Sequence, residues 1–222
     1  MRTKLIYFVR HGETELNARG IRQGPDGPLS PKGVEQVKET AVRLPHKKGE
    51  EPQVLISSPF QRAKETAAIL SDAFHLPVEY SDLLVERRNP SEIVGHSGKE
   101  TPVKAIVDRI DKSYHDDTFR ISDEENFVDL KDRAAALLRF IEKRSEKRLL
   151  MVTHSIFLRM VVSYMLLGKN LSASEYNRLS YLNPIDNAAV VICSYTKRLF
   201  RKPKWRLLVW NDIPQPQRDD DE

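Results

Sequence analysis

Residues 5–14 read Leu-Ile-Tyr-Phe-Val-Arg-His-Gly-Glu-Thr, an apolar run that ends abruptly in charged and polar residues. Five consecutive apolar residues of β-branched, aromatic and aliphatic types are typical of a strand that is buried on both faces of a sheet. In an open α/β sheet, ligands bind in the crevice outside the carboxyl ends of the strands. A cation, an imidazole and a glycine at that place would face an anion with little steric obstruction. We therefore predict that His11 is a nucleophile and that Arg10 helps to hold a phosphate for it.

The composition limits the kinds of site that the chain can carry. Its 222 residues are enough for one large α/β domain, and 40% of them are hydrophobic, which suffices for a core. The formal charge of +4 is compatible with an anionic substrate and with nucleic acid, but the basic stretches interleaved with aromatic residues that would favour nucleic acid are missing. Cys193 is the single cysteine, which excludes an internal disulfide and a cysteine-based metal cluster. The longest apolar stretch, 156–167, is too short to span a bilayer and nothing resembles a signal peptide, so we expect a cytoplasmic protein without a membrane partner.

The chain after the first strand alternates between helix and strand signals. Ser30-Pro31 is typical of an N-cap followed by proline at the first helical position, and Ser58-Pro59 repeats this signal after a short apolar strand at 53–57. The alternation predicts an α/β fold, a three-layer α/β/α sandwich with a mostly parallel central sheet and crossover helices. Further strands are expected at 78–80, 148–153, 188–195 and 205–210, the last two as a hairpin, and further helices at 101–114, 127–141 and 155–168 and after a capping box at 172–175.

Residues 87–125 interrupt this pattern with an irregular and polar segment that contains one helix signal. We interpret the segment as an insertion over the sheet edge, either a lid or a passive surface excursion. No change in composition there suggests a separate domain. We therefore predict a single domain over 1–213 and a disordered acidic tail at 214–222.

Two histidines follow apolar strands directly. His11 follows the first strand, and His154 follows the strand at 148–153. Because neighbouring parallel strands present their carboxyl ends at the same edge, we expect both side chains to lie at one rim. A lone histidine at such a place is more often structural, but a pair of them beside Arg10 favours a catalytic site.

The stretches that carry these residues resemble a known family. Arg-His-Gly-Glu-Thr-Glu-Leu-Asn at 10–17 is similar to the signature of the histidine phosphatase superfamily, the phosphoglycerate mutase-like branch, or branch 1. Ser-Ser-Pro-Phe-Gln-Arg-Ala-Lys-Glu-Thr-Ala at 57–67 resembles its second segment, Val-Thr-His at 152–154 its third, and 205–212 its closing strand. The matches spread over nearly the whole chain in the family's order.

The resemblance implies a phosphohistidine mechanism. His11 matches the nucleophile, and His154 the second histidine that binds the phosphoryl group. Glu86 resembles the acid/base carboxylate, and the alternative, less favoured, is that it pairs with the arginines that follow it on the surface. The resemblance implies that three further residues contact the phosphate: Arg10, Arg62 and Asn17.

The physical chemistry of these residue types agrees with such roles. A neutral imidazole attacks phosphorus without first losing a proton. Arginine forks donate two hydrogen bonds to one phosphate, and we expect Arg62 in the first turn of a helix, where the helix dipole also favours anions. One departure from the family is Ser155, where many members carry glycine; we expect Ser155 to cap the helix that follows.

Three functions remain open at this stage. The first is a metal-independent phosphomonoester hydrolase acting on a small phosphorylated substrate or a phosphoprotein. The second is a phosphoglycerate mutase-type phosphoryl transferase; mutases of the family carry a longer, basic segment after the Glu86 position, whereas this chain continues Asn-Pro-Ser-Glu-Ile-Val-Gly at 89–95, which favours the hydrolase. The third is an inactive module that binds phosphorylated ligands. No carboxylates and histidines lie at metal-ligand spacing beside the motifs, so we expect neither a metal nor a cofactor; His75, His96 and His115 are expected to be solvated.

Overall fold

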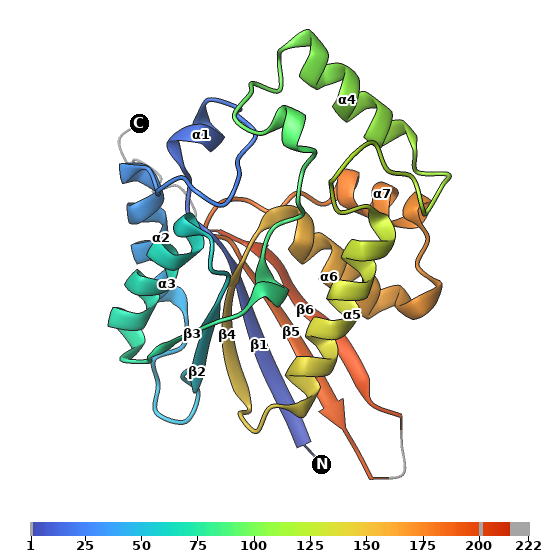
Figure 1. The fold of residues 1–222 in the computed structure, drawn as a ribbon. Coiled ribbons are helices and arrows are strands. Elements are labelled where there is room, and N and C mark those ends of the chain that lie inside the picture. The colour runs from blue at the N-terminus through green and yellow to red at the C-terminus, as the bar shows by residue number, and fades with distance from the viewer. Residues whose placement is uncertain (1, 200–201, 214–222) are drawn as a thin grey trace, which may run out of the picture.

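The computed structural model describes residues 2–199 and 202–213, and within them six strands form one sheet in the order β3-β2-β4-β1-β5-β6 (Figure 1). Strands β1 to β4 are parallel, β5 is antiparallel to β1, and β6 is antiparallel to β5. The predicted mostly parallel α/β fold is therefore confirmed. The strands are β1 (Arg2–Arg10), β2 (Val54–Ser57), β3 (Val78–Tyr80), β4 (Arg148–Thr153), β5 (Val190–Lys197) and β6 (Lys204–Asp212).

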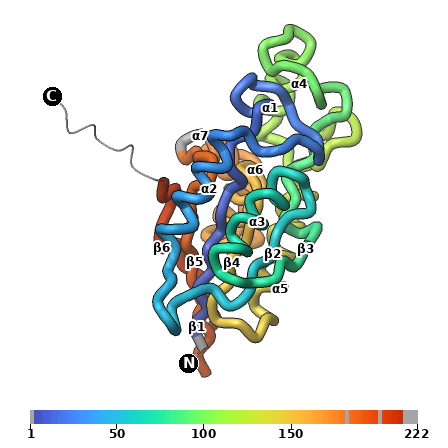
Figure 2. Tube along the Cα trace, turned by 90° about the vertical axis from the view of Figure 1, so that its left-hand side faces the viewer, coloured from blue at the N-terminus to red at the C-terminus, as the bar shows by residue number. Residues whose placement is uncertain are grey.

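Helices cover both faces of the sheet, as Figures 1 and 2 show from two sides. Helices α2 and α3 pack on one face, and α5 and α6 pack on the other. Alternate residues of β1 point to opposite layers: Ile6 and Phe8 join the core under α5 and α6, and Tyr7 and Val9 join the core under α2 and α3. The helices are α1 (Glu15–Ala18), α2 (Pro31–Arg43), α3 (Gln61–Phe74), α4 (Thr101–Lys112), α5 (Phe127–Lys143), α6 (Ser155–Leu167) and α7 (Ala173–Leu182), with 3-10 turns η1 (Asp82–Leu84), η2 (Ser91–Ile93) and η3 (Gly168–Asn170).

Most of the helix starts lie where the sequence signals predict them. The Ser30 hydroxyl accepts a hydrogen bond from the Gly33 N–H at the start of α2, and Ser172 and Glu175 form the capping box of α7. The prediction for α3 is wrong by two residues, because the helix begins at Gln61 with Phe60 as its N-cap. The physical reason is that the Ser58 hydroxyl accepts from the Phe60 N–H at 3.3 Å and lies 2.9 Å from His154 Nε2, so it holds a turn and a site contact instead of capping a helix.

The insertion at 87–125 lies above the carboxyl ends of the parallel strands, with α4 at the top of Figure 1. Its two ends meet, since the Glu125 N–H donates to the Arg88 carbonyl at 3.0 Å. Its middle is held by the loop after α1: the Gly95 N–H donates to the carbonyl of Arg22 at 2.8 Å, and the Arg22 N–H donates to that of His96 at 3.0 Å. The insertion therefore covers the edge where the candidate residues lie; movement as a lid stays a prediction.

None of the helices in the described part of the chain combines the length and the apolar character that a membrane crossing needs. His75, His96 and His115 are exposed, as predicted. The predicted disordered tail at 214–222 lies outside the described residues.

Candidate active site

The site forms where three parallel strands end. Arg10, the last residue of β1, is in register with Thr153 of β4, and Ser57 of β2 is one step away beside Val152. The next residue along each strand is His11, His154 or Ser58, so the sheet itself brings these side chains together. The imidazole centroids of His11 and His154 are 5.0 Å apart, and the two residues are 4% and 0% exposed.

The hydrogen bonds of His11 decide which ring nitrogen carries the proton. Nδ1 lies 2.7 Å from the Gly12 carbonyl oxygen, which only accepts, so Nδ1 must donate. Nε2 lies 3.2 Å from Nε of Arg62, which donates to it. Burial lowers the pKa of His11 well below its usual 6.5, and the charges of Arg10 and Arg62 lower it further. His11 is therefore a neutral imidazole whose Nε2 lone pair faces the arginine.

Two arginines lie at this end of the sheet, Arg62 buried and in contact with the lone pair and Arg10 half-buried. Arg62 is the second residue of α3 and 2% exposed; its Nη1 donates to the Gly24 carbonyl at 2.8 Å. Arg10 donates from Nη1 to the Ile185 carbonyl at 2.6 Å, and its buried Nε has no hydrogen-bond partner within the described residues. Burial lowers the pKa of Arg62 to about 10 and also lowers that of Arg10, while the Glu86 carboxylate raises both. Both guanidinium groups stay charged at neutral pH and have donors left for an anion.

His154 supplies the second imidazole of the site. Its Nε2 lies 2.9 Å from the Ser58 hydroxyl, and its buried Nδ1 has no partner within the described residues. The Phe60 ring lies edge-on at 5.2 Å. Burial lowers the pKa of His154 well below 6.5, and His11 and the nearby arginines lower it further. This ring too is neutral, and one of its nitrogens is available to a ligand oxygen.

Glu86 connects the site to the start of α6. Its Oε1 accepts from the backbone N–H groups of Arg87 and Phe157, both at 2.9 Å, and its Oε2 accepts from that of Ile156 at 3.1 Å. The expectation that Ser155 caps this helix is wrong, because Ser155 is the first helical residue and the Glu86 carboxylate binds the free N–H groups of the first turn. The alternative pairing of Glu86 with neighbouring guanidinium groups is not what this geometry shows, since its three bonds go to backbone donors.

The remaining candidates lie further out. Asn17 is in α1, where its N–H donates to the Thr14 hydroxyl at 3.0 Å, and its buried Oδ1 has no partner within the described residues. No hydrogen bond joins it to the two histidines or two arginines in the described part of the chain. Glu13, in the same segment, accepts from Ser30 and Lys32 and so supports the start of α2.

A pocket of about 700 Å³ opens beside Glu86, and neither histidine is among the residues that line it. It shares Glu86, Phe60 and Gly24 with the phosphate site, and the first half of the insertion forms much of its wall. Within residues 2–199 and 202–213, no three His, Cys, Asp or Glu side chains lie together as a metal ion would require. The pocket can take the part of a substrate that follows the phosphoryl group.

Sequence reasoning missed several groups that hold this site. The Ser58 hydroxyl was read only as a helix signal, and the carbonyl groups of Gly24 and Ile185 come from loops without a pattern. The family-like segment at 57–67 contains Ser58 and could have indicated it; nothing in the sequence indicates which loop carbonyl an arginine will reach.

Comparisons with known proteins show which family this chain resembles in sequence and in fold. The family model described as the histidine phosphatase superfamily (branch 1) matches residues 6–213. A metal-independent phosphoserine phosphatase from Arabidopsis thaliana is 30% identical over 94% of this chain and 81% of its own length. A probable phosphoglycerate mutase from Citrobacter koseri is 28% identical over 94% of this chain and 93% of its own length. The structure of a mycobacterial glucosyl-3-phosphoglycerate phosphatase in complex with VO3 has a similar fold, with a TM-score of 0.76 over 94% of this chain and 99% of that one at 24% identity. The chain belongs to the histidine phosphatase superfamily, branch 1.

Proposed function

We propose that the protein is a metal-independent phosphomonoester hydrolase that works through a phosphohistidine on His11. The observation that carries the proposal is the neutral tautomer of His11, whose Nε2 accepts from Arg62, with the charge of Arg10 and the ring of His154 close by. These groups supply positive charge and hydrogen bonds for the equatorial oxygens of a phosphoryl group, which is what phosphoryl transfer chiefly requires.

The reaction has two steps. In the first, Arg62 Nε transfers its hydrogen bond from His11 Nε2 to the bound phosphate, Nε2 attacks phosphorus, the bond from phosphorus to the ester oxygen breaks, and Glu86, protonated at the start of the cycle, gives its proton to the departing oxygen. In the second, water attacks the phosphohistidine, Glu86 takes a proton from the water, and the nitrogen–phosphorus bond breaks. The products are an alcohol and inorganic phosphate, and both His11 and Glu86 return to their starting states.

The two oxygens of Glu86 are suited to different tasks. Oε1 already accepts two backbone N–H groups, whereas Oε2 accepts one. A carboxylate oxygen has two lone-pair sites, so Oε2 keeps one site for a proton. We assign the proton exchange to Oε2 and the fixed orientation to Oε1.

The substrate is a small phosphorylated compound or a phosphoprotein, with Asn17 as a further phosphate contact and the cytoplasm as the place of action. Support for a hydrolase comes from the metal-independent phosphoserine phosphatase among the relatives. The second candidate is a phosphoglycerate mutase-type transferase, which the similarity to a probable phosphoglycerate mutase favours. The two differ only in what receives the phosphoryl group from His11.

The covalent step can be trapped directly. During turnover of a ³²P-labelled aryl phosphate in excess EDTA, rapid quenching should capture label on His11 that is labile in acid and stable in base. His11→Ala should lower kcat at least ~10³-fold, because the nucleophile and its partners act as a unit.

The exposed His75 at the end of α3 provides the matched control, and His75→Ala should keep both label and rate. Label on a serine or an aspartate would overturn the mechanism. So would an activity that EDTA abolishes and a divalent cation restores.

A further inference from the structure

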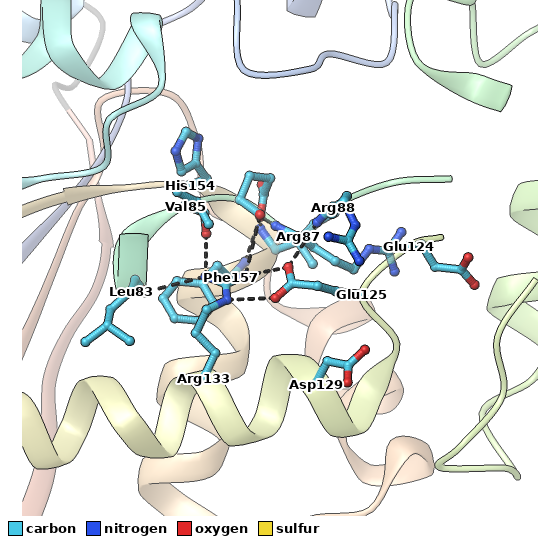
Figure 3. A network of polar contacts seen from close by, with 12 residues as sticks. Leu83, Val85, Arg87, Arg88, Glu124, Glu125, Asp129, Arg133, His154 and Phe157 are labelled. Atoms are coloured by element: carbon cyan, nitrogen blue, oxygen red, sulfur yellow. Dashed lines mark hydrogen bonds and ion pairs between the residues drawn. The ribbon is translucent and has the colours of Figure 1, made fainter. Parts of the chain in front are cut away.

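Arg133 of α5 lies beneath the site, 13% exposed, in the network that Figure 3 shows. Its Nη1 donates to the carbonyl of Val85 at 2.7 Å and lies 3.5 Å from that of Leu83, and its Nη2 lies 3.5 Å from the carbonyl of Glu86. One guanidinium group therefore faces the carbonyls along the segment that leads to the candidate acid/base residue. A planar fork can do this, whereas a lysine ammonium has no comparable spread of fixed donors.

The same guanidinium group also contacts the helix that binds the Glu86 carboxylate. Its carbon Cζ lies 3.9 Å from the centroid of the Phe157 ring. The backbone N–H of Phe157 donates to Glu86 Oε1 at 2.9 Å. Arg133 thus supports Glu86 in two ways. It contacts the main chain of Glu86 and the residues before it, and it contacts Phe157, whose N–H binds the Glu86 carboxylate.

Glu125 fixes the direction of Arg133. Its carboxylate accepts from Nε and Nη2 of Arg133 at 2.8 and 2.7 Å, a bidentate pair, and from the Arg88 N–H at 3.0 Å. Figure 3 shows this carboxylate between the two arginines. Arg88 and Glu125 are the two ends of the insertion that covers the pocket, so the ion pair ties these ends to the segment that carries Glu86.

We propose that Arg133, oriented by Glu125, is a positioning residue that holds the Glu86 carboxylate at the phosphate site. This inference rests on the proposed function, because it presupposes that Glu86 exchanges protons with the substrate. Arg133 itself touches no reacting atom. Its loss leaves the carbonyls of Leu83, Val85 and Glu86 without this donor and Phe157 without its partner, so the carboxylate moves away from the departing oxygen.

The test uses the need of the leaving group for a proton. An alkyl phosphate expels a strongly basic alkoxide and depends on Glu86, whereas a nitrophenyl phosphate expels a stabilised phenolate that can leave unprotonated. In burst kinetics, Arg133→Met should lower the phosphorylation rate of the alkyl phosphate by about 10²-fold and that of the nitrophenyl phosphate only a few-fold, as expected for a displaced catalytic group. Arg133→Lys and Glu125→Gln should show the same selectivity for the alkyl phosphate with smaller losses of phosphorylation rate. These two variants replace Arg133→Met in the test if that variant does not fold.

The Glu86→Gln background separates this role from others. Arg133 also lowers the pKa of His154, so its charge has a second route to the site. If Arg133 acts through Glu86, then Arg133→Met adds little to the loss that Glu86→Gln alone causes. An equal cost in both backgrounds, or equal losses on both substrates, would overturn the inference.

A second measurement does not depend on activity. Amide hydrogen exchange, resolved by NMR, should show faster exchange at Ile156 and Phe157 in Arg133→Met, because these N–H groups lose the carboxylate that protects them. Arg144→Met is the matched control: Arg144 pairs with Glu79 at the other end of the sheet and lies over the Phe140 ring at 5.6 Å. It should change neither the exchange at α6 nor the substrate selectivity.

Phosphohistidine formation and amide exchange at α6 together distinguish a failure of the proposed function from a failure of the positioning role. If wild-type protein forms no phosphohistidine but the α6 amides lose protection in Arg133→Met, the proposed function falls and the structural support of Glu86 stands. If wild-type protein forms phosphohistidine and the α6 amides are unchanged, the positioning role falls alone.

Discussion

At the residue scale, the neutral state of two buried histidines is the property on which the chemistry depends. His11 and His154 are desolvated and lie close to the positive charges of Arg10 and Arg62, and both effects disfavour an imidazolium. The sequence allowed us to predict that these four side chains lie at one edge of the sheet, because strand ends and a helix start are visible as patterns. It could not determine the tautomer of His11, because that depends on where the Gly12 carbonyl points.

This burial makes the folded protein sensitive to acid. Each histidine has a pKa near 6.5 in the unfolded chain and well below 6.5 in the folded one. Below about pH 6.5, protons bind the unfolded chain and not the folded one, so the free energy of unfolding falls as the pH falls, by up to about 1.4 kcal/mol per pH unit for each histidine. Urea unfolding at several pH values between 7.5 and 5 should therefore show a shallower decline for His154→Gln, whose amide can keep the contact to Ser58. His75→Gln, at an exposed position, should keep the wild-type slope; parallel slopes for His154→Gln and wild type would contradict this reading.

At the element scale, the sequence predicted most strands and helices within about two residues, and β1 begins three residues before the apolar run at Leu5. Buried strands and amphipathic helices leave periodic patterns, and β4 was predicted at its observed bounds, Arg148–Thr153. The start of α3 was missed because tertiary contacts of Ser58 override a local signal. The cap of α6 was missed for the same reason, since Glu86 reaches it from a segment about 70 residues earlier in the chain.

The contact between β1 and α2 also escapes a sequence pattern, although it fixes the position of His11. A Cβ atom added to Gly12 would lie 2.5 Å from the Gly33 carbonyl oxygen, and one added to Gly33 would lie 2.0 Å from that of Glu13. Two glycines therefore allow the strand end and the first turn of the helix to touch through their backbones.

Gly33→Ala should consequently disturb both stability and rate. The backbone after His11 must shift to admit the methyl group, which we expect to lower the free energy of unfolding by about 1–3 kcal/mol and to lower kcat as well. Urea unfolding and steady-state kinetics measure the two effects. Gly98→Ala is the control, because a Cβ atom there meets nothing closer than 3.6 Å. Equal behaviour of the two variants would mean that the close approach does not constrain the site.

At the scale of the whole molecule, the insertion and the sheet edge enclose a pocket whose charges are balanced. Its wall contains Arg87, Arg88 and Arg133, and it also contains Asp82, Glu86, Asp123 and Glu125. The sequence placed the insertion over the sheet edge but could not predict this wall, because the pairing of residues 37 and more positions apart is not visible locally.

The balance of charges bears on the choice between hydrolase and mutase. A mutase must retain a sugar acid while its second phosphate is added, so its pocket has to hold several negative charges beside the phosphohistidine. A wall with four carboxylates and three arginines attracts such an acid only weakly, so we expect the acid to leave and water to attack the phosphohistidine.

With a phosphoglycerate as substrate, we therefore expect inorganic phosphate to form faster than the isomer by at least ~10-fold, which corresponds to a barrier difference of about 1.4 kcal/mol. ³¹P NMR resolves the substrate, the isomer and free phosphate in one time course. His11→Ala should give neither product, which excludes a contaminating activity. Isomer in large excess over phosphate would decide for the mutase, and it would mean that cations outside this wall, such as Arg10 and Arg62, hold the acid.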